Sequence, residues 1–228
     1  MILNIFLSIF QSVNYLIEYL FKGHLNEKKF YKENLKDKKI IVLDIGSNVG
    51  TYIKLITKTF KEKELEIHSF EPIKRLIDKQ KAKNAILIKN NVLVSNSSGK
   101  EVFFERKISS QSSIFNKENM GINEGIKTYD VVKISVDEYI LNNNVEKIDI
   151  LKIDVEGNEL QIIKALENIF TKKIIKIIKI ESSVAYFSDN IQIQKILNHN
   201  NYDFIGTTNN KYVKNNILVW DSFFILRN

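Results

Sequence analysis

From residue 38 onward, short apolar runs alternate with segments whose apolar residues recur at helical spacing. The apolar runs, rich in β-branched residues, predict strands at 40–45, 65–70, 85–89, 148–153 and 173–180. The helical spacing between them predicts helices at 52–60, 73–83, 160–170 and 191–199. Strands that alternate with helices predict βαβ units, right-handed crossovers and a mainly parallel sheet in an α/β domain.

Residues 92–140 interrupt this alternation. The segment 92–107 (VLVSNSSGKEVFFERK) predicts a hairpin that turns at Ser97-Ser98-Gly99. A polar loop at 108–125 follows, and then an alternating strand that runs into a helix start at 127–140. Two further strands, 202–206 and 217–226, are predicted near the C-terminus.

The first 22 residues predict a separate amphipathic helix with one narrow polar stripe. Its polar positions are Asn4, Ser8, Gln11, Ser12, Glu18 and Lys22. The remaining wide apolar face needs cover. We expect it to pack on the domain or in a homodimer, with peripheral membrane contact through residues 1–21 as the alternative. Polar residues at nearly every turn disfavour a transmembrane span. The segment matches a signal peptide poorly, because a basic n-region and a small-residue cleavage site are both missing from its pattern.

A lysine-rich connector follows this helix and is interpreted as a partly helical linker. We therefore expect an N-terminal helix and linker at 1–37 and a single domain at 38–228, in a cytoplasmic protein that is membrane-associated only if the N-terminal helix makes it so. The chain has no cysteine, which excludes disulfides, thiolate zinc sites and a cysteine nucleophile. The net charge of +7 comes from dispersed lysines. We attribute it to compositional bias and expect no DNA partner.

The first predicted strand ends in LDIGSNVG, a turn with glycines at 46 and 50. This spacing is neither the dinucleotide fingerprint nor a phosphate loop. Asp44 would repel a pyrophosphate and suits a ligand with a cationic group. The alternative is an ordinary strand-to-helix turn capped by Asn48.

The second predicted strand ends in SFEP, which places Glu71 where nucleoside-binding α/β folds hold ribose hydroxyls. The alternative is an acid that favours the start of the next helix. Together, a glycine turn, Asp44 and Glu71 fit S-adenosylmethionine, which carries a sulfonium, an ammonium and an adenosine.

In order, the motifs LDIGSNVGTY, FEP, NVLVSNSSG, ISSQSSIF, VVKISVDEYI and DILKIDVEGNELQIIKAL occur along residues 38–185. This set resembles the FkbM family of S-adenosylmethionine-dependent methyltransferases. The resemblance implies a Rossmann-like class I methyltransferase fold, with a seven-stranded sheet whose last strand is antiparallel and helices on both faces. It also implies O-methyl transfer, often to sugar hydroxyls, and a small-molecule or glycan acceptor.

The resemblance also implies roles for individual residues. It places a first set in the glycine turn beside the methionine end of the cofactor: Asp44, Gly46, Ser47, Asn48 and Gly50. Glu71 would hold the ribose, and Asn90 and Asn91 would meet the adenine edge. Ser112, with Ser113, matches a serine pair that faces the cofactor or the acceptor, or only caps its loop.

The segment IDILKIDVEGNEL carries the predicted acceptor chemistry. Methylation of a hydroxyl requires removal of its proton, and Asp154, at a strand end, is our candidate base. Glu156 points the same way because strand side chains alternate, and mutual repulsion should raise one of the two pKa values. The alternatives are a helix cap for Asp154 and first-turn acids for Glu156 and Glu159. We expect Glu159 to be a first-turn acid.

Two other arrangements use the same strand ends. Asp154, Glu156 and Glu181 could bind Mg²⁺, but our prediction contains no metal. Lys152, Asp154, Lys179 and Glu181 resemble the set used by RNA ribose 2′-O-methyltransferases of this fold. A non-catalytic interaction module is the third alternative. His68 is expected to be a hydrogen-bonded core residue.

Overall fold

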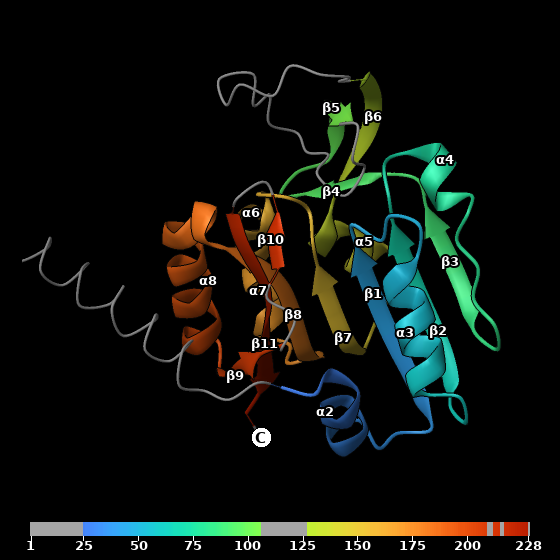
Figure 1. The fold of residues 1–228 in the computed structure, drawn as a ribbon, viewed down its shortest axis with the longest axis vertical. Helices are drawn as coiled ribbons and strands as arrows, with labels where there is room; N and C mark the ends of the chain where they lie inside the picture. Colours follow the sequence, from blue (N-terminus) through green and yellow to red (C-terminus); the bar gives the residue numbers. More distant parts are fainter. Residues whose placement is uncertain (1–24, 106–126, 209–211, 215–216, 228) are drawn as a thin grey trace, which may run out of the picture.

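The computed structural model describes residues 25–105, 127–208, 212–214 and 217–227. Most of the strands form one sheet in the order β10-β11-β8-β7-β1-β2-β3, with β9 also paired to β11 (Figure 1). Its parallel strands are β1 (Lys39–Ile45), β2 (Glu64–Phe70), β3 (Ile86–Asn90), β7 (Ile148–Ile153) and β8 (Ile175–Ser183). The antiparallel edge consists of β9 (Tyr202–Thr207), β10 (Tyr212–Lys214) and β11 (Ile217–Leu226).

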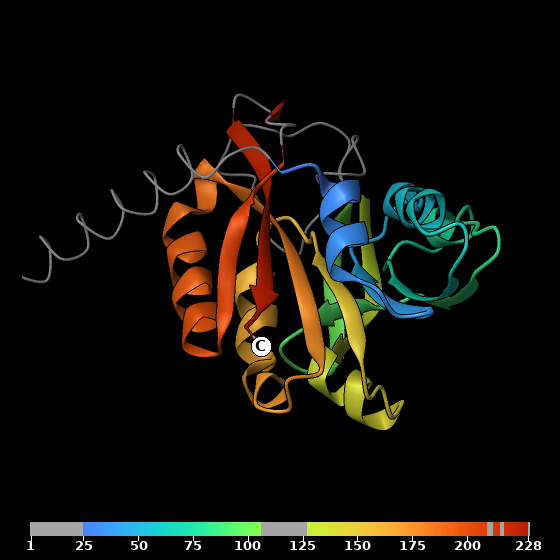
Figure 2. The ribbon, with the colours of Figure 1, turned by 90° about the horizontal axis from the view of Figure 1, so that it is seen from below.

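Helices cover both faces of this sheet (Figure 2). One face packs against α2 (Glu27–Asn34) and α3 (Thr51–Thr59), around Val42, Ile150 and Ile177. The other face packs against four helices: α5 (Val136–Asn142), α6 (Glu159–Ala165), α7 (Glu167–Phe170) and α8 (Phe187–His199). Side chains alternate along a strand, so Asp44, Lys152 and Lys179 lie on the α2/α3 face, in line with the first core. The predicted fold class is confirmed, and β10 is one short strand beyond the seven expected.

The predicted hairpin at 92–107 is wrong. Strands β4 (Leu93–Ser95) and β5 (Gly99–Glu105) do not pair with each other. Both pair with β6 (Lys127–Ser135), β4 in parallel and β5 antiparallel, to form a small second sheet. This order buries Leu93, Phe103 and Val131 together against α4 (Lys74–Ile77), which explains why β6 lies in the middle.

Two predicted helices are shorter than the sequence pattern indicated. The helix expected at 73–83 is only α4, because the chain then bends and turns the Gln80 side chain into a buried hydrogen-bond network. The helix expected at 160–170 is divided at Leu166 into α6 and α7.

The segment interpreted as a linker contains α2, which is part of the packed domain. Phe30, Tyr31 and Leu35 are all buried in the core beneath the α2/α3 face. The helix expected at residues 1–22 lies outside the described residues, as do Ser112 and Ser113. In the described part of the chain, no helix combines the length and apolar character needed to cross a membrane.

Candidate active site at the carboxyl ends of the strands

The turn after β1 brings the predicted cofactor side and the predicted acceptor side together. Gly46 has a φ of 75°, and a Cβ there would lie 1.8 Å from the carbonyl oxygen of Asp154. The Asp154 N–H donates to the carbonyl of Ile45 at 3.1 Å. Glycine is therefore required at position 46 by the neighbouring strand end, a reason that the sequence did not suggest.

The start of α3 lacks a side-chain cap. Its N-cap is Gly50, in the left-handed region at φ 82°, and not Asn48. The Asn48 side-chain oxygen accepts instead from the N–H of Val49 at 2.8 Å. The first N–H groups of α3 therefore have no side-chain oxygen from the cap residue, as in the helix starts that receive anionic or polar ligand groups.

Gln80 holds the glycine turn through hydrogen bonds, a role that no sequence pattern indicated. Its amide donates to Ser47 Oγ at 2.8 Å and to the carbonyl of Asn48 at 2.7 Å, and its oxygen accepts from Ser69 at 2.7 Å. The Ser47 hydroxyl in turn donates to the carbonyl of Phe70 at 3.1 Å. Ser47 is buried, so its hydroxyl serves the shape of the turn.

Glu71 lies directly after β2 and faces the same turn. Its two carboxylate oxygens accept from the N–H of Asn48 at 3.0 Å and of Ile73 at 2.9 Å. The side chain is only 5% exposed. Burial raises the pKa of Glu71 to about 7, against the lowering effect of the two N–H donors.

The two asparagines after β3 bind backbone near Glu71. Asn90 donates to the carbonyl of Ser69 at 3.2 Å, and Asn91 donates to the carbonyls of Glu71 at 2.9 Å and Pro72 at 2.8 Å. Their amide groups thus hold the end of β2 in place. Asn91 is exposed and Asn90 is half-buried.

Asp44 lies beneath the turn, fully buried, and forms an ion pair with Lys152 on β7. The Lys152 Nζ lies 3.0 Å from Asp44 Oδ1 and 3.3 Å from Asp154 Oδ2, and it donates to the carbonyl of Gly46 at 3.0 Å. Burial raises the pKa of Asp44, although Lys152 opposes this. For Lys152, burial lowers the pKa, but the carboxylates of Asp154 and Asp44 outweigh it and the net shift is upward. Lys152 therefore links the cofactor turn to the candidate base.

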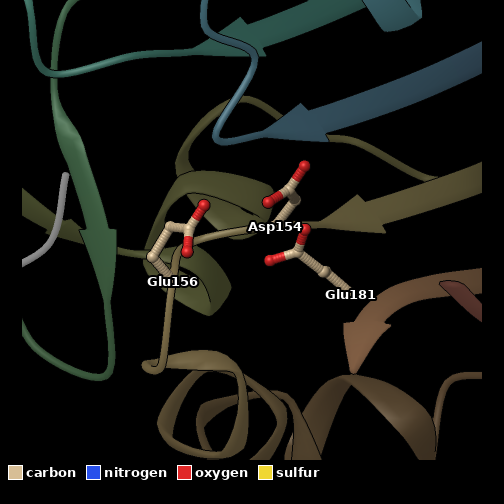
Figure 3. A group of neighbouring side chains, drawn as sticks. All are labelled: Asp154, Glu156 and Glu181. Atoms are coloured by element: carbon tan, nitrogen blue, oxygen red, sulfur yellow. The ribbon is translucent and has the colours of Figure 1, made fainter. Parts of the chain in front are cut away.

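Three carboxylates converge where β7 and β8 end. Candidate ligand atoms of Asp154, Glu156 and Glu181 all lie within 4.8 Å of one another, and each side chain is half-buried. Figure 3 shows the three groups turned toward a common space, Asp154 and Glu156 from the segment after β7 and Glu181 from β8. The three residues that the sequence offered as an alternative cation site are therefore neighbours in the structure. The set is oxygen-only, as a hard cation such as Mg²⁺ prefers.

Neither Asp154 nor Glu156 is the cap of α6, whose N-cap is Asn158. Glu159 occupies the first turn, as expected. Its carboxylate accepts from the N–H of Val155 at 3.0 Å and of Gly157 at 2.9 Å, and it holds the loop that carries Glu156. Burial raises the pKa of Glu159, opposed by these N–H donors.

Lys179, beside Lys152 in the sheet register, belongs to a different network. Its Nζ lies 3.0 Å from Glu27 of α2 and 3.1 Å from Asp221 of β11, and 4.9 Å from the centre of the Tyr52 ring. The ammonium is thus held by Glu27 and Asp221, whereas Asp154 and Glu181 meet with Glu156.

His68 is a core residue, as expected. It is buried, and its two ring nitrogens lie 2.8 Å from the Tyr139 hydroxyl and 2.9 Å from a Glu66 carboxylate oxygen.

Comparisons with known proteins agree with this geometry. The hexuronic acid methyltransferase AglP of Haloferax volcanii is 27% identical over 148 residues, which cover 63% of this chain and 57% of that protein. The crystal structure of the methyltransferase FkbM from Methylobacillus flagellatus KT matches with a TM-score of 0.52 and 13% identity, covering 87% of this chain and 50% of that chain. This chain therefore spans less than two thirds of the length of either protein.

The family described as the methyltransferase FkbM domain matches residues 44–204, more than half of the chain. The match includes the glycine turn, Glu71 and the converging carboxylates. Both the expected cofactor and the expected family are confirmed: the chain belongs to the FkbM family of methyltransferases, whose cofactor is S-adenosylmethionine.

Proposed function

We propose that this protein is an S-adenosylmethionine-dependent O-methyltransferase whose acceptor is a sugar hydroxyl. The observation that carries the proposal is the convergence of Asp154, Glu156 and Glu181 beside the glycine turn. In open α/β sheets, ligands bind beyond the carboxyl ends of the strands, which is where both groups lie.

The residues of the turn fit the cofactor. Each oxygen of Glu71 accepts one backbone N–H, and a carboxylate offers about four acceptor positions in all. Glu71 can therefore also accept from two ribose hydroxyls. When bound, S-adenosylmethionine supplies an activated methyl group on its sulfonium. Asp44 is fully buried, so we assign it the support of Lys152 and not direct contact with the ligand.

We assign to Asp154 the removal of the proton from the acceptor hydroxyl. Lys152 Nζ lies 3.3 Å from the carboxylate of Asp154, and the Asp154 N–H donates to the carbonyl of Ile45. The carboxylate is therefore held in position before the acceptor binds, so little conformational entropy is lost in the reaction. Glu156 and Glu181 can accept hydrogen bonds from further hydroxyls of the same acceptor. A sugar, with several adjacent hydroxyls, uses three neighbouring carboxylates better than an acceptor with one hydroxyl.

The name of the Haloferax relative, a hexuronic acid methyltransferase, also supports a sugar acceptor. The RNA alternative needs Lys179 in the same set as Asp154. Here its ammonium is occupied by Glu27 and Asp221, which favours the sugar.

The experiment is calorimetry with S-adenosylhomocysteine, followed by transfer from radiolabelled S-adenosylmethionine to a panel of methyl glycosides, free hexuronic acids, nucleotide sugars and RNA. Glu71→Ala should weaken S-adenosylhomocysteine binding. Asp154→Asn should leave binding within about twofold and lower turnover by about 10²-fold or more, the scale of general-base catalysis. Glu62→Gln, an exposed acid between α3 and β2, is the matched control and should change neither.

Three outcomes would overturn the proposal. Correctly folded protein that does not bind S-adenosylhomocysteine would exclude the cofactor site. Transfer to RNA but not to sugars would establish the RNA alternative. Binding with no transfer to any panel member would favour the non-catalytic interaction module.

A further inference from the structure

The loop after β7 has a backbone that ordinary residues avoid. Glu156 has a φ of 60° and Gly157 a φ of 113°. A side chain other than glycine, asparagine or aspartate is uncommon in the left-handed region, so contacts around the loop must hold Glu156 there. Glu159 supplies one such contact, through its hydrogen bonds to the N–H groups of Val155 and Gly157.

The second contact comes from Tyr186, in the 3₁₀ helix η3 (Val184–Tyr186) that follows β8. A Cβ built on Gly157 would lie 2.7 Å from both Cζ and the hydroxyl oxygen of Tyr186. The phenol end of Tyr186 therefore lies directly against the Gly157 backbone and leaves no room for a side chain there.

This contact joins the two chain segments that supply the carboxylates. Glu181 lies on β8, five residues before Tyr186, whereas Glu156 immediately precedes Gly157. A change in the Tyr186–Gly157 contact would therefore move Glu156 relative to Glu181 and Asp154. The cofactor turn is held by other groups, Gln80 and Glu71, so it should be insensitive to the same change.

We infer that Tyr186 is a positioning residue, which packs on Gly157 and keeps the Glu156 carboxylate within the group formed with Asp154 and Glu181. The inference rests on the proposed function, because that group is assigned to the acceptor. Tyr186 acts through Glu156, so its effect should vanish when the Glu156 carboxylate is gone.

The test is a double-mutant cycle with an acceptor that the wild type methylates. Tyr186→Ala should lower kcat/KM for the acceptor by about tenfold or more, with S-adenosylhomocysteine affinity within twofold. Tyr186→Phe keeps the ring edge against Gly157 and should restore kcat/KM to within about threefold of wild type. In a Glu156→Gln background, Tyr186→Ala should cost less than about threefold, because coupled residues are non-additive. Tyr129→Ala, which removes a half-buried tyrosine of the small sheet, is the control and should be additive with Glu156→Gln.

A second readout does not need turnover. Hydrogen exchange at the Val155 and Gly157 amides should quicken by about tenfold or more in Tyr186→Ala and stay unchanged in Tyr186→Phe. Equal kcat/KM losses in both Glu156 backgrounds, a parallel loss of cofactor affinity, or unchanged exchange would overturn the inference. If the wild type itself transfers no methyl group, the proposed function fails, and the exchange result alone decides the Tyr186 contact.

Discussion

The raised pKa of Glu71 makes cofactor affinity depend on pH near neutrality. Burial raises this pKa to about 7. Ribose hydroxyls donate hydrogen bonds, and the ionised carboxylate accepts them more strongly than the neutral acid. Binding therefore favours the ionised form. With a pKa of about 7, roughly a tenth of Glu71 is ionised at pH 6 and nine tenths at pH 8, so we expect affinity to rise about tenfold, or ~1.4 kcal/mol, across that interval.

The unliganded protein should respond to pH in the opposite direction. The folded-state pKa of Glu71 lies above its unfolded value, so its contribution to stability is fully present below the unfolded pKa of about 4.3 and is lost as pH rises through about 7. The difference between the two pKa values corresponds to about 4 kcal/mol at most. Stability of the unliganded protein should thus fall over the same range in which cofactor affinity rises.

Calorimetry with S-adenosylhomocysteine from pH 6 to 8.5, paired with urea unfolding, measures both trends. Glu71→Gln is the control, because its side-chain amide does not titrate. Any pH dependence that comes from titration of the ligand is still present in this variant. It should bind more weakly and with a flatter pH profile. The reasoning is refuted if wild-type affinity is constant from pH 6 to 8, or if Glu71→Gln retains the wild-type slope.

Three further predictions concern Lys152, the N-terminal segment and the carboxylate group. Lys152→Met leaves Asp44 buried without its cation and should lower the free energy of unfolding by about 3–5 kcal/mol in urea titrations. The double variant with Asp44→Asn should recover part of this loss. A Lys152→Met variant as stable as the wild type would contradict the ion pair. A variant that lacks residues 1–24 should still unfold cooperatively. Deleting residues 1–37 also removes the buried side chains of Phe30, Tyr31 and Leu35 and should lower the free energy of unfolding by at least about 5 kcal/mol. Equal stability of the two truncations would refute a structural role for α2. EDTA should leave methyl transfer unchanged, and a loss that Mg²⁺ restores would show that Asp154, Glu156 and Glu181 bind a metal.

The centre of the parallel sheet could be predicted because β1, β7 and β8 are apolar runs rich in β-branched residues and are largely buried on both faces. The same regularity explains the convergence of Asp154 and Glu181. Asp154 directly follows β7 and Glu181 lies near the end of β8, and parallel neighbours end at the same edge of a sheet. The small sheet could not be predicted this way. Ser97, Ser98 and Gly99 indicated a tight turn between two paired strands. Instead β6, from a later part of the chain, lies between β4 and β5, and Leu93 is buried with Phe103.

The backbone contacts near the site also could not be predicted from the sequence pattern. Gly46 and Gly50 looked like a ligand-approach pattern, yet the space at Gly46 is filled by the carbonyl of Asp154. Gln80 stood in a segment with helical spacing, and its role depends on a bend that the periodicity did not contain. Such contacts join residues that are distant in sequence, so no local pattern encodes them.

Two buried lysines of the sheet, Lys152 and Lys179, show why charge along the sequence is a poor guide to charge in space. Lys152 and Lys179 are direct neighbours in the register of β7 and β8, an arrangement that is repulsive if they are considered alone. In the structure each ammonium has two acids of its own, Asp44 and Asp154 for one and Glu27 and Asp221 for the other. The acids that hold Lys179 include Glu27 of α2, a segment that the sequence pattern predicted to be part of a linker. Because Glu27 and Asp221 occupy Lys179, Lys152 is the lysine that connects the cofactor turn to Asp154. Changes at Lys152 should therefore affect both cofactor binding and proton removal, whereas changes at Glu27 should affect stability first.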